Sequence, residues 1–157
     1  MDLGFESLRD RQRTTMSIPT YRKFKKNDTE AVINLWETCK RVVDWNDPLK
    51  DIKRKLFIKD NLFIIGEINK KIIATAMAGY DGHRGYIYYL AVLPELQKKG
   101  IGSSILSLVE EKLYKLVCPK INLFVRNTNF KVKAFYKTNN YKIKNSQIYG
   151  KRLIDDN

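Results

Sequence analysis

Three apolar runs, the first rich in β-branched residues and the third in tyrosine, follow one another in the middle of this 157-residue chain, and they constrain the fold more than any other feature. The first covers residues 62–68 and is separated from the second, residues 71–80, by the tight-turn pair Asn69-Lys70. A short loop rich in turn formers, residues 81–85, leads into the third run, which ends at residue 93. Turns this short join antiparallel neighbours, so the sequence predicts three antiparallel strands in succession.

The segment after these strands has the pattern of an amphipathic helix followed by a further strand. Apolar side chains recur at near-helical spacing from Ile101 to Leu116, and Pro119 is expected to end this helix. Residues 120–126 are predicted to be a strand, and a helix that connects two strands of one sheet makes those strands parallel. We therefore predict an α/β (α+β) fold: a mixed, mostly antiparallel sheet flanked by helices, with one β-α-β unit.

Further elements are predicted on both sides of this central part. Asp28 is a favourable N-cap and Pro48 a favourable first-turn residue for two of the helices. The predicted elements are a strand at residues 20–25, helices at 29–42, 48–57 and 129–138, and one or two closing strands within 141–153.

The length indicates one domain, which we place at residues 19–157, and we expect residues 1–18 to be a disordered extension. The extension lacks the apolar stretch of a secretory signal, and no run in the chain approaches the roughly 20 apolar residues that span a bilayer. Cys39 and Cys118 lie far apart in apolar surroundings, so we expect free thiols and a cytoplasmic location. His83 is the only histidine, and no metal site is expected.

The formal net charge of +13 suits anionic partners such as nucleic acid, acidic lipid surfaces or a nucleotide cofactor. The lysines, however, are spread along the chain from Lys23 to Lys151, which is typical of a solvated surface. No aromatic and basic signature of an RNA-binding module accompanies them. We therefore expect neither a nucleic acid nor a membrane as a partner, and we expect a monomer or a homodimer.

Residues 97–102, with the sequence Gln-Lys-Lys-Gly-Ile-Gly, join the third strand to the helix that follows. A helix N-terminus offers unpaired amides and the positive end of the helix dipole, and glycine lets an anion approach the backbone closely. Such a junction suits a pyrophosphate, although two glycines at this spacing also occur in a simple turn that opens a helix. Ser103-Ser104 excludes a P-loop, which needs Gly-Lys-Ser/Thr, and Ile105 stands where a dinucleotide fingerprint has its third glycine.

Two blocks of the sequence resemble the acyl-CoA signature of the GNAT superfamily of N-acetyltransferases. Residues 90–102 contain the pattern Q/R-x-x-G-x-G/A. Residues 125–141 are similar to V-x-x-x-N…A-x-x-Y…G-[FY], with Asn140 in place of the usual glycine, and asparagine tolerates the left-handed conformation that this turn needs. Shorter segments resemble the bacterial YpeA-type acetyltransferases. These segments are residues 35–37, 45–48, 79–85, 118–121 and 150–154.

The resemblance implies that the domain is a GNAT N-acetyltransferase that takes acetyl-CoA as its acyl donor. It implies that the backbone of Leu90, Ala91 and Val92 pairs with the pantetheine arm, although these residues would also serve as core strand. Asn129 could reach the coenzyme, cap the helix that it precedes, or do both. The other residues expected to bind the coenzyme are Gln97, Lys98, Lys99, Gly100, Ile101, Gly102 and Ser103.

The resemblance gives Tyr136 a chemical role, because a hydroxyl beside the thioester can give a proton to the leaving sulfur. The alternative is a core tyrosine with a bonded hydroxyl. The tryptophan of the 45–48 segment could equally pack against the turn between two helices, and Asp-Gly in the 81–85 loop is also a hairpin signal. The residues expected to border the acceptor site are Trp45, Asn46, Tyr80, Asp81 and His83.

The sequence thus predicts direct transfer of an acetyl group from acetyl-CoA to a primary amine within a ternary complex. The acceptor amine and the general base are left open. The alternative is a GNAT-fold module that binds acyl-CoA, RNA or a protein without turnover. The intact loop at residues 97–102 together with Tyr136 favours the enzyme.

Overall fold

The computed structural model describes residues 18–157, so the predicted N-terminal extension, apart from Ile18, lies outside the described residues. Five strands form one sheet in the order β1-β2-β3-β4-β5. β1 to β4 are antiparallel neighbours, whereas β4 and β5 are parallel, so the predicted mixed, mostly antiparallel sheet is confirmed. The strands are β1 (Thr20–Lys23), β2 (Phe63–Ile68), β3 (Lys71–Tyr80), β4 (Gly85–Val92) and β5 (Ile121–Asn122).

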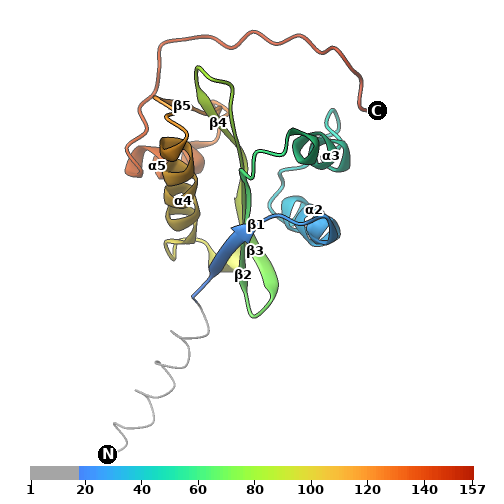
Figure 1. Ribbon diagram of the computed structural model, residues 1–157. Coiled ribbons are helices and arrows are strands. Elements are labelled where there is room, and N and C mark those ends of the chain that lie inside the picture. Colours follow the sequence, from blue (N-terminus) through green and yellow to red (C-terminus); the bar gives the residue numbers. More distant parts are fainter. Residues whose placement is uncertain (1–17) are drawn as a thin grey trace, which may run out of the picture.

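Helices cover both faces of the sheet. α2 (Thr29–Thr38) and α3 (Pro48–Ile58) lie on one face, and α4 (Ile101–Lys115) and α5 (Phe130–Thr138) lie on the other (Figure 1). The predicted β-α-β unit is therefore formed by β4, α4 and β5. Two short 3-10 helices complete the described part, η1 (Lys26–Asp28) and η2 (Pro94–Leu96).

Side chains point alternately to the two faces of each strand, and they form two apolar layers. On β2, Ile64 packs in the layer under α4, whereas its neighbours Phe63 and Ile65 pack in the layer under α2 and α3. Trp36 of α2 is fully buried in this second layer and stacks on Tyr89 of β4, with ring centroids 3.8 Å apart. Both faces of the sheet are thus buried, and α2 packs directly against β4. This strand precedes residues 97–102, which are called the coenzyme loop below.

Local hydrogen bonds explain where the first helices begin. Asp47 accepts two hydrogen bonds from first-turn amides of α3 (2.9 and 3.3 Å), and Pro48 follows it, as predicted. Asp28 precedes α2 but does not cap it. Its carboxylate accepts instead from the Arg22 guanidinium (2.8 and 2.9 Å) and from the Lys25 amide (2.8 Å). The predicted capping role of Asp28 is therefore wrong, because a charge-assisted pair with β1 occupies the carboxylate.

The last two predicted strand regions differ most from expectation. β5 covers only Ile121–Asn122 rather than residues 120–126, and residues 141–153 form no strand. A strand needs a neighbour that supplies ladder hydrogen bonds, and the two residues of β5 offer almost no edge. The final segment runs over the outside of the molecule to α3, where Asp156 pairs with Arg54 at 2.7 Å (Figure 1).

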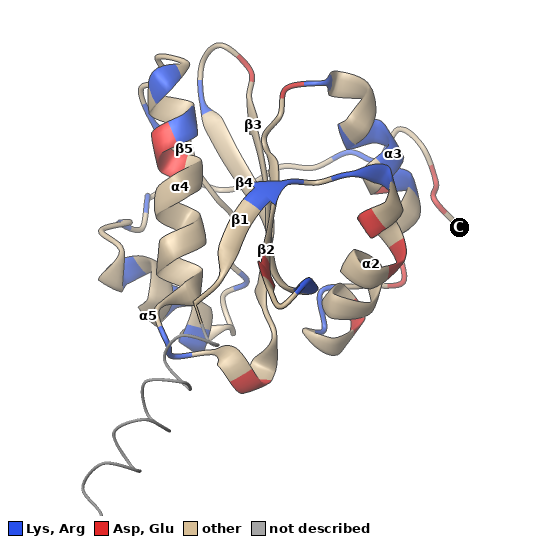
Figure 2. Ribbon diagram, turned by 60° about the horizontal axis from the view of Figure 1, so that its bottom comes forward, with Lys and Arg blue, Asp and Glu red and all other residues tan. Residues whose placement is uncertain are grey.

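Basic side chains occur on both helical layers rather than on one face. Figure 2 shows Lys and Arg on α3 and β1 and again on the side of α4 and α5. This distribution agrees with the interpretation of the +13 charge as a solvated surface. Within residues 18–157, no helix combines the length and the apolar character needed to traverse a lipid bilayer.

Candidate active site

The edge of β4 that faces β5 is unpaired for most of its length. The parallel pairing begins at Gly85 and ends at Tyr86. Beyond that point, along residues 87–92, no other strand of the described chain lies on this side. Backbone amides and carbonyls along this edge are available to an extended ligand that itself contains amide groups.

A β-bulge distorts β4 within this unpaired part. Opposite residues 75–77 of β3, β4 carries one residue more than its partner, and Tyr89 takes a φ of +52°. The fully buried Thr75 holds the distorted strand in place. Its hydroxyl donates to the Tyr89 carbonyl (2.7 Å) and accepts from the indole nitrogen of Trp36 (2.8 Å). The shape of the unpaired edge is therefore fixed from the α2 side of the sheet.

The loop after η2 presents free backbone amides at the start of α4. Gly100 is the N-cap residue, with a φ of +82°, and a Cβ placed on it would meet nothing within 4 Å. The helix ladder begins with the hydrogen bond from the Ser104 amide to the Gly100 carbonyl (3.0 Å), so the three earlier amides precede the ladder, and no side chain caps them. Lys98 and Lys99 are exposed beside them. This arrangement suits an anion.

Gln97 fastens the same loop to its surroundings. Its side-chain amide donates to the Val92 carbonyl (3.0 Å), and its oxygen accepts from the Lys131 ammonium of α5 (3.2 Å). The Ile101 side chain is buried in the core under the sheet, and Ser103 is partly buried. These residues can therefore offer a coenzyme chiefly their backbone, whereas the two lysines before them offer charge.

The two glycines of the loop have different structural roles. Gly100 has open space around it, as expected for the close approach of a ligand. A Cβ on Gly102 would lie 3.1 Å from the ring of Phe135, so this glycine makes room for α5. The close packing of α5 on the first turn of α4 thus places Phe135 beside Gly102, and the next residue, Tyr136, packs against the same core cluster as Ile101.

Tyr136 lies edge-on to two neighbouring rings, 5.1 Å from Phe135 and 5.5 Å from Tyr141 between centroids. Its hydroxyl has no hydrogen-bond partner within residues 18–157. Burial raises the pKa of Tyr136 to about 12, and the positive charge of Arg41 offsets part of that rise. Tyr136 is therefore protonated at neutral pH with its O–H free to donate. Asn129 caps α5 through its Oδ1, which accepts from the Val132 amide (3.2 Å).

The loop between α2 and α3 meets the chain that follows β5. Trp45 is 54% exposed, and the Arg126 guanidinium lies 5.6 Å from its ring centroid. Two residues before Arg126, the ring of Phe124 lies 6.2 Å from that of Tyr88 on β4. Residues 124–126 thus connect β4 to Trp45. The neighbouring Asn46 accepts a hydrogen bond from Arg152 at 3.1 Å.

The structure places Tyr80, Asp81 and His83 far from the 97–102 loop. They lie at the β3–β4 turn, at the opposite end of β4 from Val92, a span of about 23 Å at about 3.3 Å per strand residue. Hydrogen bonds from the amides of Arg84 and His83, each 2.8 Å, lower the pKa of Asp81 and close the turn. The Tyr80 hydroxyl donates to a carbonyl of the same turn (3.1 Å). These three residues would contact only an acceptor that extends along β4.

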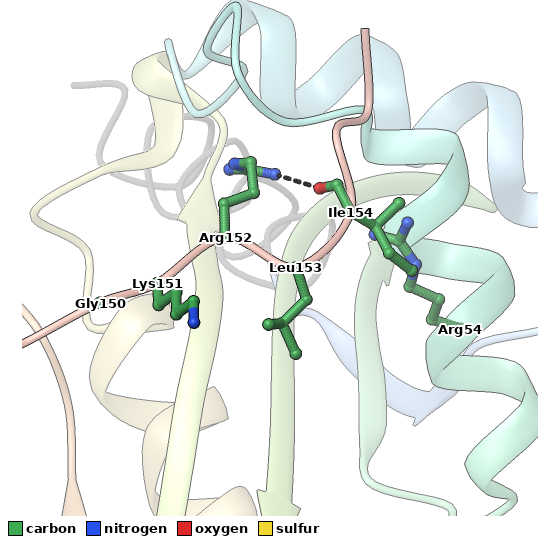
Figure 3. A pocket seen from close by; sticks show the side chains of 6 residues that line it. All are labelled: Arg54, Gly150, Lys151, Arg152, Leu153 and Ile154. Atoms are coloured by element: carbon green, nitrogen blue, oxygen red, sulfur yellow. Dashed lines mark hydrogen bonds between the residues drawn. The ribbon is translucent and has the colours of Figure 1, made fainter.

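A cavity of about 550 Å³ lies between α3 and the final segment of the chain (Figure 3). Arg152 lies beside it, donating to the Ile154 carbonyl (3.3 Å), and Arg54 lines the α3 side. No residue of the 97–103 loop lines this cavity, so it is separate from the coenzyme loop. The final segment nevertheless helps to enclose the region of Asn46, through the hydrogen bond from Arg152.

Two polar residues near β4 were not singled out by the sequence pattern. The Tyr89 hydroxyl donates to the Asp51 carboxylate of α3 at 2.6 Å, and burial together with this bond raises the pKa of Tyr89. Arg41 follows α2, which ends at Thr38 rather than at the predicted residue 42, and its Nε is buried without a partner in residues 18–157. Arg41 carries no motif, so only the fold reveals it.

The model of the acetyltransferase (GNAT) family matches residues 29–141, a range that includes the unpaired edge of β4, the 97–102 loop and Tyr136. The chain belongs to the GNAT family. An acetyltransferase of Pectobacterium atrosepticum is 45% identical over 135 residues, which cover 86% of this chain and 96% of that protein. An acetyltransferase of Sodalis glossinidius is 44% identical over 136 residues, with the same coverage. The GNAT resemblance predicted from the sequence is confirmed, and this GNAT protein is an acyltransferase.

Solved structures share the GNAT fold. The PaiA N-acetyltransferase of Thermoplasma acidophilum, in complex with coenzyme A, has a TM-score of 0.66 at 18% identity and covers 83% of this chain and 93% of its own. The ribosomal-protein-S18-alanine N-acetyltransferase of Escherichia coli has a TM-score of 0.61 at 20% identity, with 77% and 76% covered. These likenesses concern the fold, and they agree with the sheet and helix layers described above.

Proposed function

We propose that this GNAT protein transfers the acetyl group of acetyl-CoA to a primary amine by direct attack within a ternary complex. The observation that carries the proposal is the unpaired edge of β4, which leads directly to the free amides at the start of α4. Pantetheine is an extended chain with amide groups, and the pyrophosphate next to it is an anion. One ligand, coenzyme A, therefore matches both features in the order in which the chain presents them.

The residues around this edge fit the coenzyme. Residues 90–92 contribute backbone groups, the first turn of α4 contributes amides, and Lys98 and Lys99 contribute charge. Gly100 leaves the space that a pyrophosphate needs for close approach. Asn129 uses its carbonyl oxygen to cap α5, which leaves its amide nitrogen for the ligand.

The chemistry requires one bond to form and one to break. The amine nitrogen attacks the thioester carbon, the C–S bond breaks, and the electron pair leaves with sulfur. The proton lost from the amine balances the proton gained by sulfur, so no further reactant is needed. Tyr136, protonated and with a free O–H, gives the proton to sulfur, and a backbone amide near Val92 stabilises the oxyanion. Neither Cys39 nor Cys118 belongs to the loop, and direct attack needs no covalent enzyme intermediate.

Coenzyme binding is tested by calorimetry with a matched pair of glycine variants. Gly100 and Gly82 both have a left-handed φ (+82° and +90°), and a Cβ on either one meets nothing within 4 Å. Replacement by alanine should therefore cost each variant a similar conformational strain of about 1–2 kcal/mol. Only Gly100→Ala should weaken acetyl-CoA binding, because Gly82 lies at the other end of β4. Equal affinities of the two variants would contradict the assignment of the loop.

Turnover is tested by measuring free thiol release with a panel of amines: amino acids, peptides with free N-termini, lysine side chains, polyamines and aminoglycosides. At least one amine should release coenzyme A in a reaction that requires the protein. Calorimetry with short RNA covers the alternative of a binding module without turnover. Binding of RNA together with the absence of heat from acetyl-CoA would refute the proposed activity.

A further inference from the structure

Arg41 is a partly buried cation that the described structure leaves without an ion-pair partner. It stands in the turn after α2, where Lys40 has a φ of +56° and the Arg41 amide donates to the Trp36 carbonyl (2.8 Å). The Nε atom of its guanidinium is buried and has no hydrogen-bond acceptor within residues 18–157. A buried donor without an acceptor costs free energy, and it regains that energy when a ligand supplies the acceptor. The side chain is therefore prepared for a group that the protein itself does not provide.

Contacts around Val92 place the turn after α2 at the unpaired edge of β4. The Cys39 thiol donates to the Val92 carbonyl (3.3 Å), and the Gln97 side chain donates to the same oxygen (3.0 Å). Gln97 in turn contacts Lys131 of α5, the helix that carries Tyr136. The turn after α2, the end of β4, the coenzyme loop and α5 thus converge on one point.

The electrostatic environment agrees with this placement. The charge of Arg41 acts on the hydroxyl of Tyr136 and on the thiol of Cys39, lowering the pKa of each against the rise caused by burial. Glu95 of η2 is the other charged group that acts on Cys39, and it makes no ion pair with Arg41 in the described residues. The groups on which the charge of Arg41 acts are therefore two neutral acids, Cys39 and Tyr136, and the carboxylate of Glu95 acts on the first of them.

From this convergence we infer that Arg41 binds the coenzyme sulfur and stabilises it as a thiolate when the C–S bond breaks. The inference rests on the proposed acetyl transfer and deepens it. The bond changes are those already given, and Arg41 keeps its proton throughout. Its charge favours the electron pair on sulfur until Tyr136 supplies the proton. Tyr136 thus acts as the proton donor, and Arg41 acts as a fixed charge for the departing group.

The direct test compares coenzyme A with desulfo-coenzyme A, which lacks the sulfur, by calorimetry between about pH 6.5 and 10.5. The alkyl thiol of the coenzyme is a weaker acid than cysteine, which ionises near about pH 8.5, and a cation within about 4–6 Å lowers the pKa of a thiol by about 1–3 units. If the bound thiol has a lower pKa than the free thiol, coenzyme A affinity rises with pH through the bound pKa and levels off above the free pKa. The affinity ratio of coenzyme A to desulfo-coenzyme A should therefore increase about tenfold or more with pH in the wild type. The desulfo ligand cancels the titration of Cys39 and Tyr136.

Two substitutions complete the test. Arg41→Gln should abolish the pH-dependent rise of this ratio and lower kcat about ten- to a hundredfold, with the KM for acetyl-CoA little changed. Arg41→Lys keeps a positive charge and should retain part of both effects. A wild type in which the ratio does not change with pH would overturn the inference without any variant. Equal losses of affinity for both ligands in Arg41→Gln would overturn it too, because they would indicate a contact with another part of the coenzyme. Failure of the wild type to bind acetyl-CoA at all would refute the proposed function.

Discussion

Replacement of Gly102 by alanine tests whether this glycine serves the packing of α5 or the approach of the coenzyme. An added Cβ would lie 3.1 and 3.2 Å from two ring atoms of Phe135 and 3.7 Å from a methyl group of Val92. The first two distances are too short for carbon atoms, so the ring must move by a few tenths of an ångström. Since Tyr136 follows Phe135, such a movement also reaches the proposed proton donor.

The expected magnitude combines two opposing effects. Overpacking in a well-packed region costs about 1–3 kcal/mol, whereas alanine in a helix gains about 0.5–1 kcal/mol over glycine. Gly102→Ala should therefore destabilise the protein by about 1 kcal/mol, which corresponds to a fall in Tm of about 2–4 °C at this chain length. In a Phe135→Leu background the clash is gone, and the same substitution should stabilise the protein by about 0.5–1 kcal/mol.

The assay is urea unfolding of the four proteins of this double-mutant cycle. The expected coupling energy of about 1.5–2 kcal/mol exceeds the roughly 0.5 kcal/mol that separates coupled from independent sites. Gly100→Ala is the matched control, because no atom lies within 4 Å of a Cβ added at this position. This substitution should therefore lower the free energy of unfolding equally with either residue at position 135. An effect of Gly102→Ala that is equal in the two backgrounds would show that the glycine does not make room for the ring.

Three further predictions concern single side chains. Tyr136→Phe should lower kcat by about a hundredfold while the KM for acetyl-CoA stays within about twofold in steady-state assays, and unchanged turnover would remove the hydroxyl from the chemistry. Thr75→Val removes the acceptor of a buried indole N–H, so urea unfolding should show a loss of about 1–3 kcal/mol; a neutral effect would refute the role of this hydroxyl. Arg54 holds the pKa of Asp156 at about 2, below the unfolded value near 3.9, so this pair stabilises the fold above about pH 4 and loses its effect as pH falls through about 2. Asp156→Asn should therefore lower the Tm at pH 7, with a difference from the wild type that shrinks between pH 4 and pH 2; a constant difference would contradict the pair.

The elements that the sequence predicts well are those whose signals are local. The Asn69-Lys70 turn is formed by two residues with left-handed φ values of 50° and 64°, and Asn140 takes the left-handed φ of 69° that was expected of it. Pro48 stands in the first turn of α3, and Asn129 caps the helix that it precedes. In each case the residues that determine the conformation lie within a few positions of one another, so a pattern in the chain is sufficient.

The incorrect predictions depend on residues that are distant in sequence. In one case a distant residue competes for a side chain, and in another the neighbouring strand that a segment would need is too short. Asp28 has the position of an N-cap, but Arg22 on β1 takes its carboxylate. Residues 141–153 contain β-prone side chains, yet β5 offers only two residues as an edge. At the 97–102 loop the glycine pattern predicts close approach of a ligand at both glycines, and that prediction stays open for Gly102; what the pattern does not reveal is the contact of this glycine with the ring of Phe135. None of these partners is visible in a local window of sequence.

The same distinction separates the two halves of the proposed site. The donor half depends on backbone groups of β4 and α4, whose positions follow from a strand, a loop and a helix that are consecutive in the chain, and a motif can therefore identify it. The acceptor half is assembled from the α2–α3 loop, the chain after β5 and the final segment, which meet only through pairs such as Arg126 with Trp45 and Arg152 with Asn46. Because the final segment borders the proposed acceptor site and not the 97–102 loop, substitutions in it are expected to change the choice of amine while the KM for acetyl-CoA is preserved. These segments share no periodicity, so a local sequence pattern cannot show that they meet.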